Sequence, residues 1–149
     1  MKETEKQAFL QNVYAASIAE AVNRYQHFGQ LDAVVADKKA RQVYTAPYMN
    51  EQLTITSVEE VFDRLKEVFG CANWEVESQE GTYKATATSC KLCALAKKMG
   101  GASPCSGWCI DPMAAMIMAL AEKQGKKAVV AAQSTLMDSA SCSVSISIE

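Results

Sequence analysis

Four of the six cysteines in this 149-residue chain lie within one stretch of twenty residues. They form a Cys-x2-Cys pair, eleven intervening residues and a Cys-x3-Cys pair, at Cys90, Cys93, Cys105 and Cys109. Cysteines spaced in this way bind a metal ion or an iron–sulfur cluster, carry out redox chemistry or form disulfides. Any chemistry of this protein is therefore expected first in this segment, which we call the cysteine loop.

Four thiolates about 2.3 Å from a zinc ion form a closed tetrahedral site, and an iron–sulfur cluster uses the same set of ligands. We therefore predict that Cys90, Cys93, Cys105 and Cys109 hold zinc or an iron–sulfur cluster. Lys97 falls on the same side of the expected helix as the first two cysteines, so it would lower their pKa values and offset the negative charge. A redox pair, a single reactive thiol and buried cysteines without a ligand remain alternatives.

Composition and charge narrow the classes of protein to which the chain can belong. Its length suits a single domain over residues 1–149, and its net charge of −2, with acids and bases interleaved, argues against a nucleic-acid partner. The charged N-terminus runs into an amphipathic segment, and the most apolar stretch is too short to cross a bilayer. We expect a cytoplasmic protein with no membrane partner, in a compartment that disfavours structural disulfides.

The first half of the chain has the apolar spacing of helices. One helix is predicted over residues 4–28, and a second over 31–44, ending before Ala46-Pro47 because proline disfavours helical backbone in the residue before it. A capping box at Ser57-Val-Glu-Glu60 opens a third helix, which Gly70 closes. The first two helices carry more apolar surface than one small sheet needs, so we expect a homodimer.

In the second half of the chain, apolar and polar residues alternate in the way that is typical of β-strands. Residues 74–77 and 82–88 predict a hairpin about Glu80-Gly81, and residues 127–133 and 141–148 predict two further strands. Between them, short and long helices are expected over 92–99 and 113–123, the latter opened by Asp111-Pro112 and apolar nearly all round. The predicted fold class is α+β, with an antiparallel four-stranded sheet of two hairpins that helices cover on one side. Residues 1–70 are expected to be mainly helical, and residues 71–149 to contain the sheet and the cysteine loop.

From Tyr83 onward the chain carries a recognisable set of residues: Cys90, Cys93, Cys109, Asp111, Ala115-Met116, Thr135-Leu136 and Cys142. At these positions it resembles the L-2-amino-thiazoline-4-carboxylic acid hydrolase-like family, which is similar to the 4-vinyl reductase domain and to the heme–nitric-oxide-binding and Golgi-transport ligand-binding fold. Two features differ: Met137-Asp138-Ser139-Ala140 replaces the usual Gly-Asp turn, and Gln133 stands where the family often has arginine. A carboxylate substrate would therefore lack the bidentate hydrogen bonds that an arginine guanidinium provides.

This resemblance implies a hydrolase that opens a small thiazoline-type ring. Asp111, a cysteine such as Cys142, or a bound metal would activate water for attack on the C=N carbon, while Met116 and Lys97 would contact the bound molecule. The alternative is a binding or sensing module without catalysis, whose ligand cavity lies between sheet and helices and whose four cysteines hold a structural metal. Both interpretations require a small-molecule partner.

Overall fold

The computed structural model describes all residues, 1–149, and shows the predicted α+β class. None of the helices combines the length and apolar character needed to cross a membrane. The elements in chain order are α1 (Glu3–His27), α2 (Leu31–Gln52), α3 (Val58–Phe69), β1 (Glu75–Gln79), β2 (Thr82–Ala87), α4 (Lys91–Lys98), α5 (Cys105–Trp108), α6 (Ile110–Lys123), β3 (Ala128–Ser134) and β4 (Cys142–Ile148).

The four strands form one antiparallel sheet in the order β1-β2-β4-β3. The two hairpins are those predicted, and they join through β2 and β4 in the middle of the sheet. Glu80 and Gly81 turn the first hairpin with φ values of 46° and 83°, the backbone that a tight two-residue turn requires. In β4, Cys142, Val144 and Ile146 are buried, and the serines that alternate with them lie on the opposite face of the strand.

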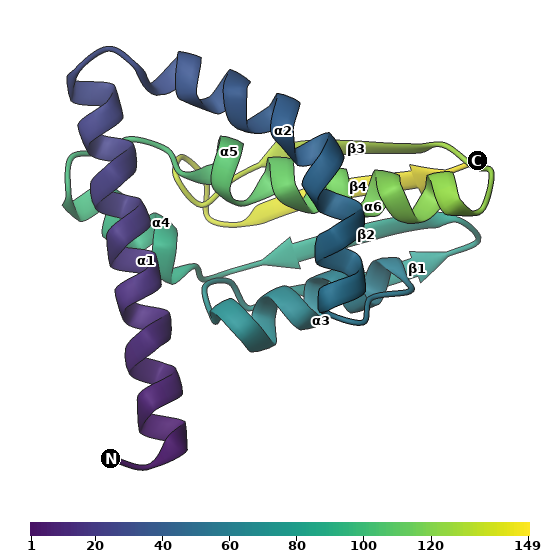
Figure 1. The fold of residues 1–149 in the computed structure, drawn as a ribbon, viewed down its shortest axis with the longest axis horizontal. Helices are drawn as coiled ribbons and strands as arrows, with labels where there is room; N and C mark the ends of the chain where they lie inside the picture. Colours follow the sequence, from purple (N-terminus) through teal and green to yellow (C-terminus); the bar gives the residue numbers. More distant parts are fainter.

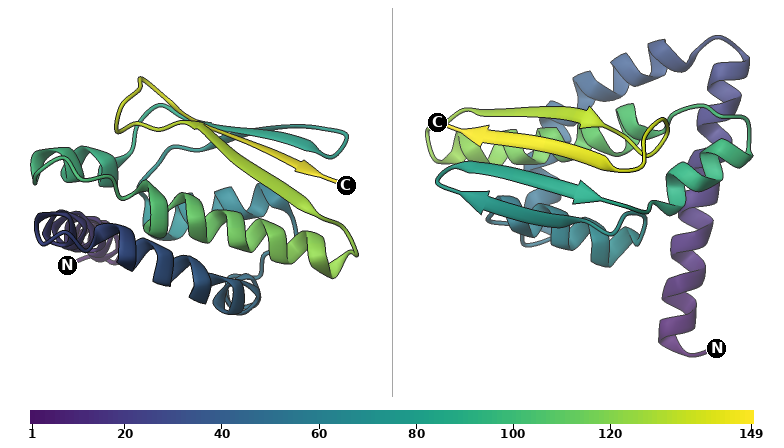
Figure 2. Two further views of the ribbon diagram at one scale, coloured as in Figure 1. Left: turned by 90° about the horizontal axis from the view of Figure 1, so that it is seen from above. Right: turned by 180° about the vertical axis from the view of Figure 1, so that it is seen from behind.

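The molecule has three layers, which Figure 2 shows from above: the sheet, then α3 and α6 against one of its faces, then α1 and α2. Phe62, Met113, Ile117 and Ile146 are almost completely buried in the main core between the first two layers. The long helix of the second half is therefore central, as its composition predicted. The helix is not buried on every side, however, because Met118 is 45% exposed.

The predicted end of the second helix is wrong, because α2 continues through Pro47 to Gln52. Its inner face is held by packing: Ala46 is buried, and Asn50 Nδ2 donates a hydrogen bond of 3.0 Å to the Met116 carbonyl of α6. Proline has no N–H for the carbonyl of Val43, one turn earlier, but both residues are exposed and water can reach that carbonyl. Tertiary contacts thus outweigh the local preference.

Helix α3 begins and ends at the predicted residues, but only the Ser57 half of the predicted capping box forms, because the Glu60 carboxylate accepts hydrogen bonds from the Thr56 and Ser57 hydroxyls instead of the Ser57 amide. Ser57 Oγ accepts a hydrogen bond of 3.2 Å from the Glu60 amide at the start of the helix. Gly70 closes the helix in the left-handed conformation, with φ of 63°. These local signals set where the chain enters the strand segment that precedes the cysteine loop.

A second, smaller core fastens the cysteine loop to the N-terminal helix. Figure 1 shows α1 crossing α4, and the buried side chains of this contact are Ala15, Ile18, Ala19, Val22, Leu92, Ala96 and Ala102. Asn23 of α1 adds two hydrogen bonds, from its Nδ2 to the Ala96 carbonyl at 3.2 Å and from the Ala102 amide to its Oδ1 at 2.9 Å. A side chain at Gly100, where φ is 144°, would collide with Asn23. The loop after α4 is therefore held against α1 both by packing and by hydrogen bonds.

Candidate functional site

Three thiols of the cysteine loop lie next to one another. Cys93 Sγ is 3.7 Å from Cys105 Sγ, and Cys90 Sγ accepts a hydrogen bond of 3.5 Å from the Cys93 amide. All six cysteines are free thiols. The fold thus brings the Cys-x2-Cys pair against the first cysteine of the Cys-x3-Cys pair.

Two cysteines from outside the loop join this group. The bridge between Ala72 and Cys90, and the hydrogen bond of 2.8 Å from the Lys91 amide to the Cys71 carbonyl, hold Cys71 beside the start of α4. Burial raises the pKa of Cys142 on β4, and the charges on Cys105 and Cys90 raise it further. The spacing of cysteines in the sequence did not predict that Cys71 or Cys142 would belong to this group. Both are positioned by β-type pairing between segments that are distant in the chain.

Cys90 occupies the N-cap of α4, and this position shapes its acidity. The chain arrives from β2 in an extended conformation, so the sulfur faces the free amides at the helix start. A hydrogen bond from the Cys93 thiol lowers the pKa of Cys90 to about 6, against the opposing effect of burial, and the Cys93 and Leu92 amides add to the lowering. Cys90 is therefore a thiolate at neutral pH.

Cys93 acts as the shared proton donor of the group. Its own pKa is raised, because its thiol hydrogen-bonds to Cys105 and to Cys90 and because it is buried. The same contact lowers the pKa of Cys105 to about 7, with burial opposing and the Ser103 and Thr135 hydroxyls assisting. A thiol has one hydrogen, so Cys93 donates it to Cys90 or to Cys105 but not to both at once, and the lowering of the pKa is shared between these two sulfurs.

Cys109 differs from the other members of the loop. We expected it to share a side with Cys105 if the segment were helical, but α5 is broken at Ser106 and Gly107, whose φ is 83°. Cys109 instead precedes α6, and burial raises its pKa, so it remains a neutral thiol. The structure contains no group of three or more histidine, cysteine, aspartate or glutamate side chains gathered for a metal ion.

A cavity of about 280 Å³ lies beside Cys90, between α1, α2, α3 and the start of α6; we call it the cysteine cavity. Its walls are mainly apolar and include Tyr14, Met49, Leu65, Phe69, Cys71, Trp74, Cys90, Leu92, Trp108, Cys109 and Met116. Two of its three cysteines are protonated at neutral pH, because burial raises the pKa of Cys71 to about 11 and raises that of Cys109 also. Cys90 is the one thiolate in the wall of this cavity.

Two polar side chains of α2 complete the cavity, and both were missed from the sequence. Gln42 Nε2 donates a hydrogen bond of 2.8 Å to the Gly107 carbonyl, which leaves its Oε1 buried and without a partner. The Lys38 ammonium lies 5.0 Å from the centre of the Trp108 ring and forms no ion pair with a carboxylate. Lys38 and Gln42 are four residues apart and therefore share one face of α2. This spacing can be read from the sequence, but it does not show that their face lies against the cysteine loop.

The structure places the remaining predicted site residues as follows. Asp111 does not line the cavity: its Oδ2 accepts a hydrogen bond of 2.7 Å from the Gly107 amide and its Oδ1 lies 3.9 Å from Lys39 Nζ. Cys142 is buried on β4 outside the cavity wall, and burial raises its pKa to about 11. Lys97 is exposed and borders a shallow surface depression that Cys90 and Cys93 also line. Of these three residues, only Lys97 lines a surface depression together with cysteines of the loop.

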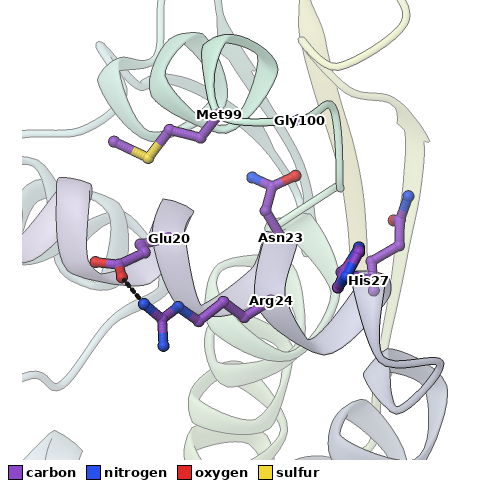
Figure 3. Close-up of a pocket in the computed structure, with 7 residues that line it drawn as sticks. Glu20, Asn23, Arg24, His27, Met99 and Gly100 are labelled. Atoms are coloured by element: carbon purple, nitrogen blue, oxygen red, sulfur yellow. Dashed lines mark ion pairs between the residues drawn. The ribbon is translucent and has the colours of Figure 1, made fainter.

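A wider and more open groove lies elsewhere on the molecule and has different chemistry. The groove has a volume of about 660 Å³ and lies between the end of α1 and the Met99-Gly100 turn. Figure 3 shows the side chains that line it. Its two main charges neutralise each other in the 2.9 Å ion pair of Glu20 with Arg24, and Asn23 is engaged in the contacts that hold the cysteine loop. His27, the only histidine, lines this groove and not the cysteine cavity. We therefore place the candidate site at the cysteine cavity.

The chain was compared with known proteins. No protein-family model matches it, and no curated protein matches it. We infer the function from the residues of the cysteine cavity.

Proposed function

We propose that the protein binds a small, mainly apolar molecule in the cysteine cavity, in contact with the Cys90 thiolate. One observation carries this proposal: a thiolate stabilised at a helix start forms part of an otherwise apolar cavity wall. The volume of about 280 Å³ is near the lower end of the range for small-molecule sites, roughly 300–1,000 Å³. A soft or electrophilic group of the ligand would lie against Cys90.

The polar atoms of the cavity suggest the chemistry of the ligand's other groups. The buried Oε1 of Gln42 has no donor, and an unsatisfied buried acceptor costs about 1–3 kcal/mol, so a small turn of this side chain toward the cavity would let it accept a hydrogen bond from a ligand N–H or O–H. Lys38 is the unpaired cation at the cavity and would attract an anionic group. Lys38 would thus supply a positive charge for a carboxylate, in place of the arginine that the resembling family often has at the position of Gln133. These features together favour a small heterocyclic or aromatic acid.

Ring-opening hydrolysis, the reaction implied by the family resemblance, has less support from the site. Asp111 already accepts the Gly107 amide and lies near Lys39, so it is poorly available as a base. Cys142 is protonated at neutral pH and lies outside the cavity. Catalysis would therefore fall to Cys90, and we propose binding as the primary function.

A soft metal ion at the thiols is a second candidate, favoured by one distance. Two thiolates bound to the same tetrahedral zinc at about 2.3 Å lie about 3.8 Å apart. Cys93 Sγ and Cys105 Sγ are 3.7 Å apart, and Cys90 adjoins Cys93. A fourth ligand from Cys109 would require its side chain to turn. Such a site would brace the wall of the cavity rather than carry out a reaction, because four cysteines leave no open position on the metal.

Binding is tested with indole-3-carboxylate, which combines a flat apolar ring, an N–H donor and a carboxylate. We expect saturable binding by calorimetry, a rise in melting temperature, and slower alkylation of Cys90 by iodoacetamide when the probe is present. Lys38→Met and Gln42→Leu should each weaken binding by about tenfold, whereas Lys97→Met, on the outer surface, should not. If neither this probe nor a 2-aminothiazoline carboxylate binds or protects Cys90, the proposal is wrong; release of a ring-opened thiazoline product would favour the hydrolase instead.

The metal proposal is tested separately by elemental analysis and a visible spectrum of protein purified without chelator or oxygen. About one zinc, or iron with sulfide, per chain is expected, falling in Cys93→Ser and unchanged in the control Cys71→Ser. Protein that contains no metal, and whose Cys90 is alkylated at the same rate with and without added zinc, would contradict a metal site. That outcome would leave the ligand proposal intact.

A further inference from the structure

Helix α1 is apolar on two opposite sides, and the rest of the chain covers only one of them. Ala15, Ile18 and Val22 are buried against α4 and the loop that follows it. On the other side, Phe9, Leu10 and Val13 are 58%, 64% and 44% exposed. At about 100° per residue these two sets lie roughly half a turn apart. The second set forms an outward stripe, which we call the α1 stripe.

The N-terminal turns of α1 have little support from the rest of the molecule. Figure 1 shows this part of the helix extending beyond the other elements, and residues 1–10 are all exposed. Their polar contacts with the body are those of Gln7 and Gln11, which donate to carbonyls at the end of α3. Helices gain most of their stability from packing of an apolar face, so three exposed turns with an apolar stripe lack the cover that such a helix normally has.

The charges at the two ends of the α1 stripe indicate what covers it. Glu3 pairs with Lys6 at 3.1 Å near one end, and Glu20 pairs with Arg24 at 2.9 Å near the other; all four side chains are exposed. If a second α1 lies antiparallel with Val13 opposite Val13, residues whose numbers sum to about 26 face each other. Lys6 then faces Glu20 of the second copy, and Glu3 approaches its Arg24. A parallel arrangement would instead oppose like charges at both ends.

We propose that a second copy of this chain docks on the α1 stripe, with the two α1 helices antiparallel about a two-fold axis near Val13. Residues 6–20 of each helix overlap over about 21 Å, with apolar side chains at the centre and the charged pairs at the ends. The contact is the same patch on both copies, so it closes as a dimer and does not extend into a filament. This surface accounts for the homodimer expected from the composition of the N-terminal helices.

A cysteine placed on the axis tests the arrangement directly. In Val13→Cys the two introduced sulfurs face each other, so mild oxidation is expected to yield a disulfide-linked dimer on a denaturing gel. Asn12→Cys is the matched control, because this neighbouring exposed residue points about 100° away from the axis. The control should give little cross-link under the same conditions. Equal cross-linking of both variants, or none of Val13→Cys, would contradict the proposed axis.

Charge reversal tests the pairing across the axis. Sedimentation of the unchanged protein at about 100 µM should give a dimer mass. Lys6→Glu and Glu20→Lys should each raise the dissociation constant by about tenfold, since each creates two repulsive contacts, while the double variant should return to within about threefold of the original. Circular dichroism checks that every variant remains folded. A monomer at this concentration, or a dimer indifferent to Val13→Glu and to both reversals, would overturn the inference.

Discussion

The acidity of Cys90 gives the sharpest test of the site, because Cys71 provides a comparison in the same cavity wall. At pH 7, a pKa of about 6 makes about nine-tenths of Cys90 thiolate, whereas a pKa of about 11 makes about one ten-thousandth of Cys71 thiolate. The ratio of thiolate populations is therefore about 9,000. The thiolate is the nucleophile, so Cys90 should be alkylated far faster.

Intrinsic nucleophilicity reduces this ratio. It falls as the pKa falls, with a coefficient of about 0.4–0.5, so the five units between the two thiols cost Cys90 a factor of about 100–300. The expected net preference for Cys90 over Cys71 is about 30- to 90-fold at pH 7. The assay is timed alkylation with iodoacetamide, followed by digestion and mass spectrometry of each cysteine peptide.

The pH profile has a definite sign. Because the folded protein lowers the pKa of Cys90, its alkylation rate should rise with pH up to about 6 and be nearly flat above 7, whereas that of Cys71 should still rise at pH 9. Cys93→Ala removes the hydrogen bond that contributes most to the lowering. Hydrogen bonds to charged groups are worth about 1.5–3 kcal/mol, so the midpoint of Cys90 should move upward by about one to two pH units.

The matched control for this variant is Cys142→Ala, which removes a buried thiol without removing a hydrogen bond to Cys90. Its Cys90 midpoint should stay near 6. If Cys90 and Cys71 react at similar rates, or if Cys93→Ala leaves the midpoint in place, the sulfur network does not control the acidity of Cys90. The proposal of a thiolate in the cavity wall would then fail.

Three further predictions concern the scaffold, each measured by urea unfolding. Asp111→Ala should destabilise the protein by about 1.5–3 kcal/mol, because the Gly107 amide loses a charged acceptor at 2.7 Å; no loss would mean that Asp111 is free for another role. Pro47→Ala should stabilise it by about 1–3 kcal/mol, since an amide at this position can complete the helical hydrogen bond to Val43, and destabilisation would show that α2 depends on the proline. Ile146→Ala, at a position 2% exposed, should cost about 2–5 kcal/mol, and a change below 1 kcal/mol would contradict its place in the core.

Much of the fold could be predicted from short-range patterns. The cap at Ser57, the glycine that ends α3, the Glu80-Gly81 turn and the alternation of β4 each depend on a few neighbouring residues, and each appears in the structure. The prediction failed at Pro47, where local preference and tertiary packing conflict. Contacts of Ala46 and Asn50 with α6 keep the helix intact, and no local pattern reports such contacts.

The candidate site divides in the same way. The sequence by itself predicted that the cysteines of the loop would approach one another and that Cys90 would stand at the start of a helix, and the structure brings together Cys90, Cys93 and Cys105 but not Cys109. Only the tertiary structure decided that Cys93 lies between Cys90 and Cys105, that Cys71 shares a cavity wall with Cys90, and that Lys38 and Gln42 complete this wall. The reason is physical: the acidity of a thiol depends on burial and on hydrogen bonds within a few ångströms, and its neighbours there come from elements far apart in the chain.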